Sequence, residues 1–192
     1  MADRILITGG CGFIGSHTAV ILLQMGYSII IIDSNLNSSP KAIERILKIV
    51  SNDSDSLDNK ISFYEGNLLD YEFIQSVFNI ENSKGNSINH VIHFAGLKSV
   101  KESTFHPLVY WEVNLVGTIN LIKAIQTNGC RNIIFSSSAT VYRQKDNDLI
   151  NEIDILNPSN PYGNTKLSIE KLLSDIYESD TNNYRIACLR YF

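Results

Sequence analysis

Short apolar runs alternate with longer segments of helical periodicity along nearly the whole chain. The runs typical of buried strands lie at residues 4–8, 28–32, 61–64, 90–94, 133–135 and 186–189. The segments between them, near 14–25, 38–51, from 70 onward, 107–128 and 161–178, repeat apolar residues at helical spacing. Strands and helices that alternate in this way predict an α/β fold. We expect a doubly wound parallel sheet of about six strands with helices on both faces.

Local signals place several helix ends. Pro107 suits the first turn of the longest helix and Gly129 suits its end, while Asn160 and Pro161 read as the N-cap and first residue of the last helix. Asp70 can cap the helix that follows it. The first helix places four apolar residues on one face, Ile14, Ile21, Leu22 and Met25. The longest helix carries four apolar residues that we assign to the core, Trp111, Leu115, Ile119 and Ile122. The polar tract at residues 51–56 is expected to form a surface loop.

The turn between the first strand and the first helix carries the pattern Gly9, Gly12 and Gly15. Glycine at these three places permits a sharp turn, close approach of the backbone to a phosphate, and close helix packing. The N-terminus of the helix then offers free N–H groups to a diphosphate. Asp33, after the second strand, can accept bonds from ribose hydroxyls and would repel a 2′-phosphate, so the pattern favours NAD over NADP in a Rossmann-type fold. The alternative is a plain strand–turn–helix without a ligand, in which the glycines only give flexibility and Asp33 is a turn or cap residue.

Composition narrows the range of functions. The chain has 192 residues, 44% hydrophobic and 19% charged, with a formal net charge of −4, which suits one globular domain and gives no support for nucleic-acid binding. The longest apolar run, at 29–32, is too short to span a bilayer, and three widely spaced cysteines argue against disulfides and fit the cytoplasm. His90 and His93 lie three apart on a strand and face opposite ways, so no metal site is expected.

The candidate chemistry lies on the last helix. Tyr162 and Lys166 are spaced i, i+4 and share one face near its start. A phenol has a reference pKa of about 10 and is a poor base unless nearby cations, here the ammonium of Lys166 and an oxidised nicotinamide, lower it. Ser138, at the end of the fifth strand, could bond the same substrate hydroxyl and relay its proton. The alternative is a surface tyrosine and a solvated lysine.

Both motifs, Thr8-Gly9-Gly10-Cys11-Gly12-Phe13-Ile14-Gly15 and Tyr162-Gly163-Asn164-Thr165-Lys166, resemble the extended short-chain dehydrogenase/reductase family over the whole chain. Within that family the chain is most similar to the epimerases that act at C4 of a UDP-hexose. That closer similarity rests on residues 15–18, 93–98, 113–118, 135–142 and 189–192. Related 4,6-dehydratases place an Asp-Glu pair where this chain has Ala139 and Thr140.

The resemblance implies NAD-dependent interconversion of UDP-galactose and UDP-glucose, by oxidation at C4, rotation of the keto sugar and reduction of its other face. The catalytic residues implied are Tyr162, Lys166 and Ser138, and the substrate contacts are Lys98, Ser99, Val100, Ser138 and Tyr162. The implied cofactor contacts are Gly9, Gly12, Phe13, Ile14, Gly15, Asp33, Asn37, Ser38, Asn67, Leu68, Phe94, Ala95, Gly96, Lys98, Asn114, Ser136, Tyr162, Lys166, Tyr191 and Phe192. The helices that start near Pro107 and Pro161 would form a homodimer interface.

Some features depart from the family pattern. Cys11, Ser34, Asn67, Arg143 and Asn164 replace its usual residues. Members of the family continue for well over a hundred residues beyond the position of Phe192, so we interpret residues 1–192 as the NAD-binding domain, with a C-terminal substrate-binding domain absent from this chain. Two alternatives stay open, a non-catalytic NAD-binding module and another NAD-dependent UDP-sugar enzyme, such as a decarboxylase or a reductase.

Overall fold

The computed structural model describes residues 4–51, 60–143 and 149–192. Its strands are β1 (Arg4–Thr8), β2 (Ser28–Asp33), β3 (Ile61–Glu65), β4 (Ile88–His93), β5 (Asn132–Ser138) and β6 (Arg185–Tyr191). Its helices are α1 (Phe13–Gln24), α2 (Lys41–Ser51), α3 (Tyr71–Ser83), α4 (Val100–Phe105), α5 (Pro107–Tyr110), η1 (Trp111–Val116), α6 (Gly117–Thr127), η2 (Ala139–Val141) and α7 (Pro161–Ser179). The expected alternation of strands and helices is confirmed, with each predicted strand within a few residues of its place.

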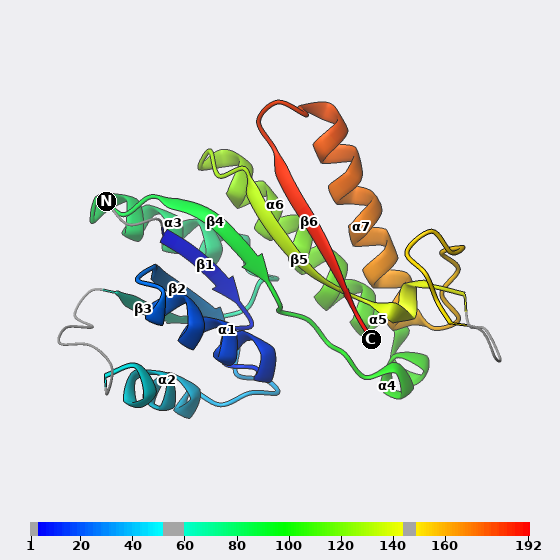
Figure 1. Ribbon diagram of the computed structural model, residues 1–192, viewed down its shortest axis with the longest axis horizontal. Helices are drawn as coiled ribbons and strands as arrows, with labels where there is room; N and C mark the ends of the chain where they lie inside the picture. The colour runs from blue at the N-terminus through cyan, green and yellow to red at the C-terminus, as the bar shows by residue number, and fades with distance from the viewer. Residues whose placement is uncertain (1–3, 52–59, 144–148) are drawn as a thin grey trace.

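The six strands form one parallel sheet in the order β3-β2-β1-β4-β5-β6. The chain order reverses between β1 and β4, where the connections leave toward opposite sides of the sheet. Because all six strands are parallel, their carboxyl ends lie at one edge of the sheet, toward the bottom of Figure 1. In such sheets this edge, at the switch point, is where ligands bind.

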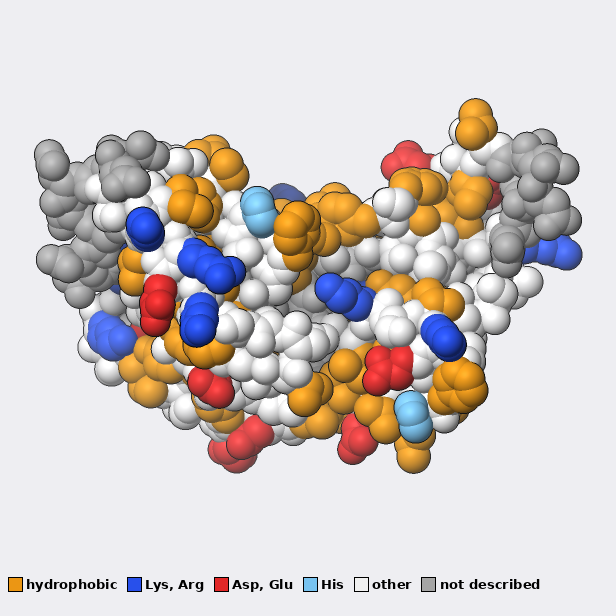
Figure 2. All heavy atoms as spheres, turned by 90° about the horizontal axis from the view of Figure 1, so that it is seen from below, with side chains coloured by type: hydrophobic (Ala, Val, Ile, Leu, Met, Phe, Trp, Pro, Cys, Tyr) orange, Lys and Arg blue, Asp and Glu red, His pale blue; other side chains and the backbone are white. Residues whose placement is uncertain are grey.

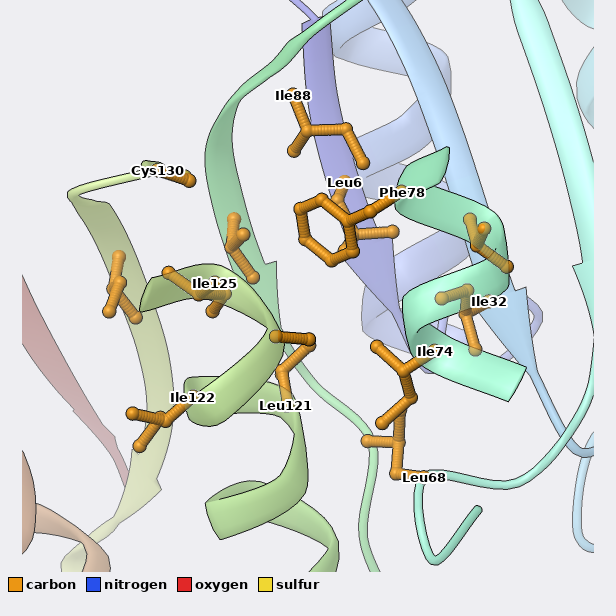
Figure 3. Packing of buried hydrophobic residues seen from close by; sticks show 14 of the residues in the cluster. Leu6, Ile32, Leu68, Ile74, Phe78, Ile88, Leu121, Ile122, Ile125 and Cys130 are labelled. Atoms are coloured by element: carbon orange, nitrogen blue, oxygen red, sulfur yellow. The ribbon is translucent and has the colours of Figure 1, made fainter. Parts of the chain in front are cut away.

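Helices cover the sheet on both faces (Figure 1). On one face α1 and α2 pack against β1, β2 and β3, and on the other face α3, α6 and α7 enclose a larger cluster of apolar side chains. Figure 3 shows Phe78 of α3 over Leu6 of β1, with Leu121 of α6 beside them, and all three are at most 1% exposed. Burying each such side chain contributes about 2 kcal/mol. This core holds the strand ends, and with them the edge of the sheet, in fixed positions.

The expected apolar face of α1 is wrong as a core face. Ile14, Ile21 and Met25 are 41%, 55% and 66% exposed, whereas the residues that face the sheet are Gly15, Ala19 and Leu23. A helix this close to the strands needs small residues at the contact, and the hydrophobicity pattern assigns no weight to glycine. The larger side chains therefore stand on the neighbouring, more exposed side of α1, and of the expected set Leu22 is half-buried against the core.

The long helix is confirmed from Pro107 but differs in detail. It runs as α5, the π-helical segment η1 and α6 to Thr127, and by length and composition alone this stretch could cross a membrane. Of its most apolar window 44% is buried, a pattern that core helices of globular proteins share. Of its expected core residues Ile122 is buried, while Trp111, Leu115 and Ile119 are half-buried.

Several smaller expectations have mixed outcomes. The caps at Asp70 and Asn160 are confirmed, because each side-chain oxygen accepts a bond from the first turn of its helix, 2.9 Å from the Phe73 nitrogen and 2.8 Å from the Gly163 nitrogen. The short helix α4 was not anticipated. The polar tract at 51–56 lies almost entirely outside the described residues, with only its first residue placed, at the end of α2.

Candidate functional site

In the glycine turn after β1 the backbone leaves no room for a side chain at Gly9 or Gly15. Gly9 has φ +72°, and its N–H donates to the carbonyl of Ile32 at 2.8 Å. A Cβ on Gly9 would lie 2.6 Å from the Ala95 nitrogen, and one on Gly15 would collide with the Gly9 carbonyl oxygen. Gly12 caps α1 without a side-chain bond, and the first turn of α1 has no acidic residue. The N–H groups of that turn are thus available to an anion such as a diphosphate.

Asp33 closes the neighbouring side of the turn at the end of β2. One of its carboxylate oxygens, Oδ2, accepts a bond from the Cys11 backbone nitrogen at 2.8 Å. The other, Oδ1, accepts from the Asn35 nitrogen at 2.9 Å and the Ser38 hydroxyl at 2.8 Å. A carboxylate has about four acceptor positions, so Oδ2 retains one for a ligand hydroxyl. Three donors therefore hold the carboxylate in place in the wall of the crevice.

The side chains on α7 and β5 face the same crevice from its other side. Tyr162 and Lys166 are 9% and 5% exposed, and the Lys166 ammonium donates to the Ser136 carbonyl at 2.8 Å. The same ammonium lies 5.8 Å from the centre of the Tyr162 ring. Ser138 Oγ accepts from the Thr140 nitrogen at 3.2 Å, which fixes it in the turn η2 after β5. Tyr162 and Lys166 therefore lie together, as their spacing predicted, and Ser138, predicted from its place at the end of the fifth strand, lines the same cavity.

Burial shifts the pKa values of Tyr162 and Lys166. Burial raises the pKa of Tyr162, because a phenolate loses hydration there, and a hydrogen bond with Ser138 lowers that pKa to a smaller extent. Burial also lowers the pKa of Lys166 to about 8. Lys166 points its ammonium at a backbone carbonyl and over the ring of Phe135, at 4.7 Å, rather than at the phenol oxygen. In the protein alone the pKa of Tyr162 is thus raised, whereas the expected lowering also requires the positive charge of an oxidised nicotinamide.

Most of the expected contact residues line one cavity of about 480 Å³ at the carboxyl edge of the sheet. Figure 2 looks onto this edge and shows the molecule hollowed between its two flanks. The expected residues that line the cavity are Gly9, Gly12, Phe13, Ile14, Gly15, Asp33, Asn37, Ser38, Asn67, Leu68, Phe94, Ala95, Gly96, Lys98, Ser136, Ser138, Tyr162, Lys166 and Tyr191. The volume lies in the range typical of cofactor sites.

Four expected residues lie outside the cavity wall. Asn114 is buried behind it, where its side chain bonds Leu97 and Thr165 and so supports the wall indirectly. Ser99 caps the short helix α4. Val100 is 41% exposed in that helix, and Phe192 is 85% exposed beside Tyr142.

The cavity also contains residues that the sequence reading did not assign to it. They are Cys11, Ile32, Ser34, Leu36, Gly66, Leu97, Val113 and Ser137. Each of them adjoins an assigned residue, as Val113 adjoins Asn114, so extending each motif by one position along the chain would have found them. Among the described residues, no group of three or more His, Cys, Asp or Glu side chains could hold a metal ion.

His93 is buried at the end of β4, and its pKa predicts how the stability of the protein depends on pH. Its ring nitrogens contact the Thr8 hydroxyl at 2.6 Å and the Thr118 hydroxyl at 2.8 Å, and burial lowers its pKa to about 3. Between pH 6.5 and 3 the unfolded chain binds a proton that the native chain excludes, so stability falls as the pH falls. We expect a loss of about 2 kcal/mol between pH 7 and 5, and a smaller loss in His93→Gln. Urea unfolding at several pH values measures this. Equal pH slopes in the two proteins would contradict it.

Comparison with known proteins shows which family and which relatives this chain is similar to. A family model described as GDP-mannose 4,6 dehydratase matches residues 6–192. UDP-glucose 4-epimerase of Bacillus subtilis (strain 168) is 46% identical over 188 residues, 98% of this chain and 52% of the relative. UDP-glucose 4-epimerase 2 of Arabidopsis thaliana is 40% identical over 192 residues, 100% of this chain and 52% of the relative. The chain therefore spans about half the length of the curated relatives it matches.

Solved structures agree with these relatives. UDP-glucose 4-epimerase from Bifidobacterium longum, in complex with NAD+ and UDP, superposes with a TM-score of 0.88 at 39% identity, over 99% of this chain and 53% of that chain. UDP-glucose-4-epimerase from Stenotrophomonas maltophila, with bound NAD and formylated UDP-arabinopyranose, gives a TM-score of 0.87 at 37% identity, over 99% and 53%. Both are structures of proteins similar to this chain.

Proposed function

Because the chain belongs to the GDP-mannose 4,6 dehydratase family, we propose that it is the cofactor-binding part of an NAD-dependent UDP-sugar 4-epimerase. The observation that carries this proposal is the meeting, in one cavity, of the glycine turn with Tyr162, Lys166 and Ser138. A diphosphate cradle and an acid–base group on opposite walls of one crevice suit a reaction in which a bound cofactor exchanges electrons with a neighbouring sugar.

The residues present fit NAD. The glycine turn leaves the N-terminal N–H groups of α1 open to a diphosphate, and a side chain on Gly15 would fill the turn itself. Asp33 retains an acceptor position for a ribose hydroxyl, and its fixed negative charge would repel the 2′-phosphate of NADP. Lys166 would hold the ribose hydroxyls next to the nicotinamide. When bound, NAD supplies the hydride acceptor and donor at the sugar carbon, together with a positive ring in its oxidised form.

Tyr162 would move the proton of the reaction. Its phenol oxygen, hydrogen-bonded by Ser138, would take the proton from the sugar O4 as C4 is oxidised and return it when the keto sugar is reduced from its other face. Burial keeps the phenol protonated in the free protein, so it would ionise only when a positive charge stands close by. Lys98 and Ser99, on the loop after β4, would contact the substrate along with Val100.

Epimerisation suits this site better than dehydration does. Loss of water from a sugar needs groups that remove one proton and protonate the departing hydroxyl. Ala139 and Thr140, which occupy η2 beside Ser138, provide no carboxylate, and the Thr140 hydroxyl donates to Ser138 Oγ at 3.0 Å. We therefore propose interconversion of UDP-galactose and UDP-glucose, a step of galactose metabolism, with a decarboxylase, a reductase and a non-catalytic NAD module as the alternatives.

We also propose a cytoplasmic homodimer. Leu108, Val109 and Val116 on the α5–η1–α6 helix are 76%, 45% and 44% exposed, and Phe105 of the adjoining α4 is 69% exposed. Apolar residues in one exposed stretch are typical of an interface between subunits. This stretch includes the helix that starts at Pro107, which the family resemblance assigned to that role.

A coupled assay tests the reaction. The protein encoded by the natural gene is supplied with UDP-galactose, and formation of UDP-glucose is followed with a UDP-glucose-specific dehydrogenase. We expect turnover without added NAD, because a cofactor enclosed by the crevice and regenerated in each cycle stays bound. Product analysis with UDP-glucuronate and with a 4-keto sugar nucleotide separates the decarboxylase and the reductase. Retention of NAD without turnover of any of these sugars would contradict the epimerase and favour the non-catalytic module.

A further inference from the structure

Two successive residues at the end of β5 each form a hydrogen bond with one residue on a single face of α7. The Ser136 carbonyl accepts from Lys166 and the Ser137 hydroxyl donates to a carboxylate oxygen of Glu170, while the next residue, Ser138, lines the same cavity as Tyr162. On the helix Tyr162, Lys166 and Glu170 are spaced four apart. The contacts of Lys166 and Glu170 are separated by about 6 Å along the helix axis, so together they limit how far α7 can slide or rotate against β5.

Glu170 differs from its two neighbours because it lies behind the cavity wall rather than on it. Glu170 is 8% exposed, and both of its carboxylate oxygens are used. Arg190 of β6 binds it through two nitrogens, at 3.0 Å and 2.7 Å, in the paired geometry that gives this contact its directionality. The Arg190 guanidinium also lies 4.9 Å from the centre of the Tyr142 ring and donates to its hydroxyl at 2.8 Å. One carboxylate thus ties α7 to β5, β6 and the loop after η2.

We propose that Glu170 is a positioning residue for Tyr162 and Lys166. Its carboxylate, fixed by Ser137 and Arg190, sets the height and rotation of α7 against the end of the sheet. The reacting side chains one and two turns earlier on the same face are thereby held where Ser136 and Ser138 meet them. This inference rests on the proposed function only in naming the reaction that the positioning serves.

Buried polar ties of this kind hold one arrangement because the alternatives leave a charge without a partner. If Glu170 loses its charge, Arg190 keeps only part of its contact and α7 can rotate or slide by a fraction of an ångström. A misplacement of about 1 Å in a catalytic group costs on the order of 100-fold in rate. Tyr162 would also move relative to Ser138, whose interaction lowers the pKa of Tyr162, and Tyr162 would then ionise at a higher pH.

The test compares Glu170→Gln with Glu81→Gln in the protein from the natural gene. Glu81 is a matched control, because it is fully buried and binds Arg4 at 2.8 Å, near the amino ends of the strands. For Glu170→Gln we expect kcat to fall about 10- to 100-fold and the rising limb of its pH profile to move to higher pH, with bound NAD retained. For Glu81→Gln we expect wild-type kcat and pH profile. Ser137→Ala, a smaller change, should act in the same direction as Glu170→Gln.

Crystal structures of both variants give a readout that does not require turnover. In Glu170→Gln the Lys166–Ser136 contact, 2.8 Å in the present structure, should lengthen, while in Glu81→Gln it should not. An unmoved pH profile together with an unmoved contact in Glu170→Gln would overturn the inference, even if kcat fell through loss of stability. If no UDP-sugar is turned over by the wild type but the contact still lengthens, the proposed function fails and the positioning role stands.

Discussion

Replacing Tyr162 by phenylalanine is expected to lower kcat about 100- to 10,000-fold, the range that a lost general acid–base group typically costs. The phenol oxygen is the only heavy atom removed, and Tyr162 lines the cavity together with Ser138. The ring stays packed because Tyr162 is 9% exposed and the helix around it is unchanged. Binding of NAD should therefore change by no more than about twofold while the chemical step is nearly lost. Coupled turnover and calorimetric titration of NAD measure the two quantities separately.

Tyr184→Phe is the matched control for this change. Tyr184 is also buried, at 4% exposed, and its hydroxyl accepts one bond from Gln126 at 3.2 Å near the start of β6, away from the cavity. Loss of this hydrogen bond should cost about 1 kcal/mol of stability and leave kcat as it is. Equal losses of kcat in the two variants would mean that Tyr162 acts through stability alone. A Tyr162→Phe protein with wild-type turnover would assign the proton transfer to another group.

Much of the fold follows from the sequence because the pattern and the physics agree. Unbroken apolar strands such as residues 29–32 occur where both faces of a parallel strand are covered, and all four of these residues are at most 1% exposed. Caps at Asp70 and Asn160 were readable because each uses a local bond within three residues. The core face of α1 was not readable, since Gly15 and Ala19 contribute through closeness rather than through hydrophobicity.

The candidate site likewise has residues that the sequence predicts and contacts that it does not. Residues in motifs of fixed spacing, such as Tyr162 and Lys166, could be assigned because helix geometry alone places them together. Contacts between distant elements could not. Glu170 belongs to the same helical face, but its partners Ser137 and Arg190 come from two different strands, and no local pattern in the sequence marks the three as one cluster. The effect of burial on the pKa of Tyr162 could not be predicted either, because a spacing argument does not measure burial.

The second large effect is expected for Gly15→Ala, which should remove cofactor binding. A Cβ at Gly15 would collide with the Gly9 carbonyl oxygen and lie 2.8 Å from the Gly10 Cα, and both of these are backbone atoms that cannot rotate away. The turn must therefore open, which moves the N–H groups that would cradle the diphosphate. Alanine gains up to about 1 kcal/mol in helix propensity, but overpacking costs about 1–3 kcal/mol, so the net effect is destabilising. Calorimetric titration with NAD should show at least a tenfold loss of affinity.

Gly117→Ala separates loss of the cradle from a general cost of replacing glycine. Gly117 has ordinary helical angles, φ −57° and ψ −42°, and its added Cβ would meet the Leu68 Cβ at 3.3 Å and the Leu68 carbonyl carbon at 3.8 Å, apart from atoms of its own helix. These contacts are much looser than the collision at Gly15, so stability should stay near that of the wild type, and NAD affinity should fall far less than in Gly15→Ala although Leu68 lines the same cavity. If Gly15→Ala binds NAD as tightly as Gly117→Ala does, the glycine turn is not the cradle, and the diphosphate must be held elsewhere along the crevice. If both variants lose NAD, the loss reflects the fold of α1 and α6 rather than the turn, and the assignment of Gly15 would have to be withdrawn.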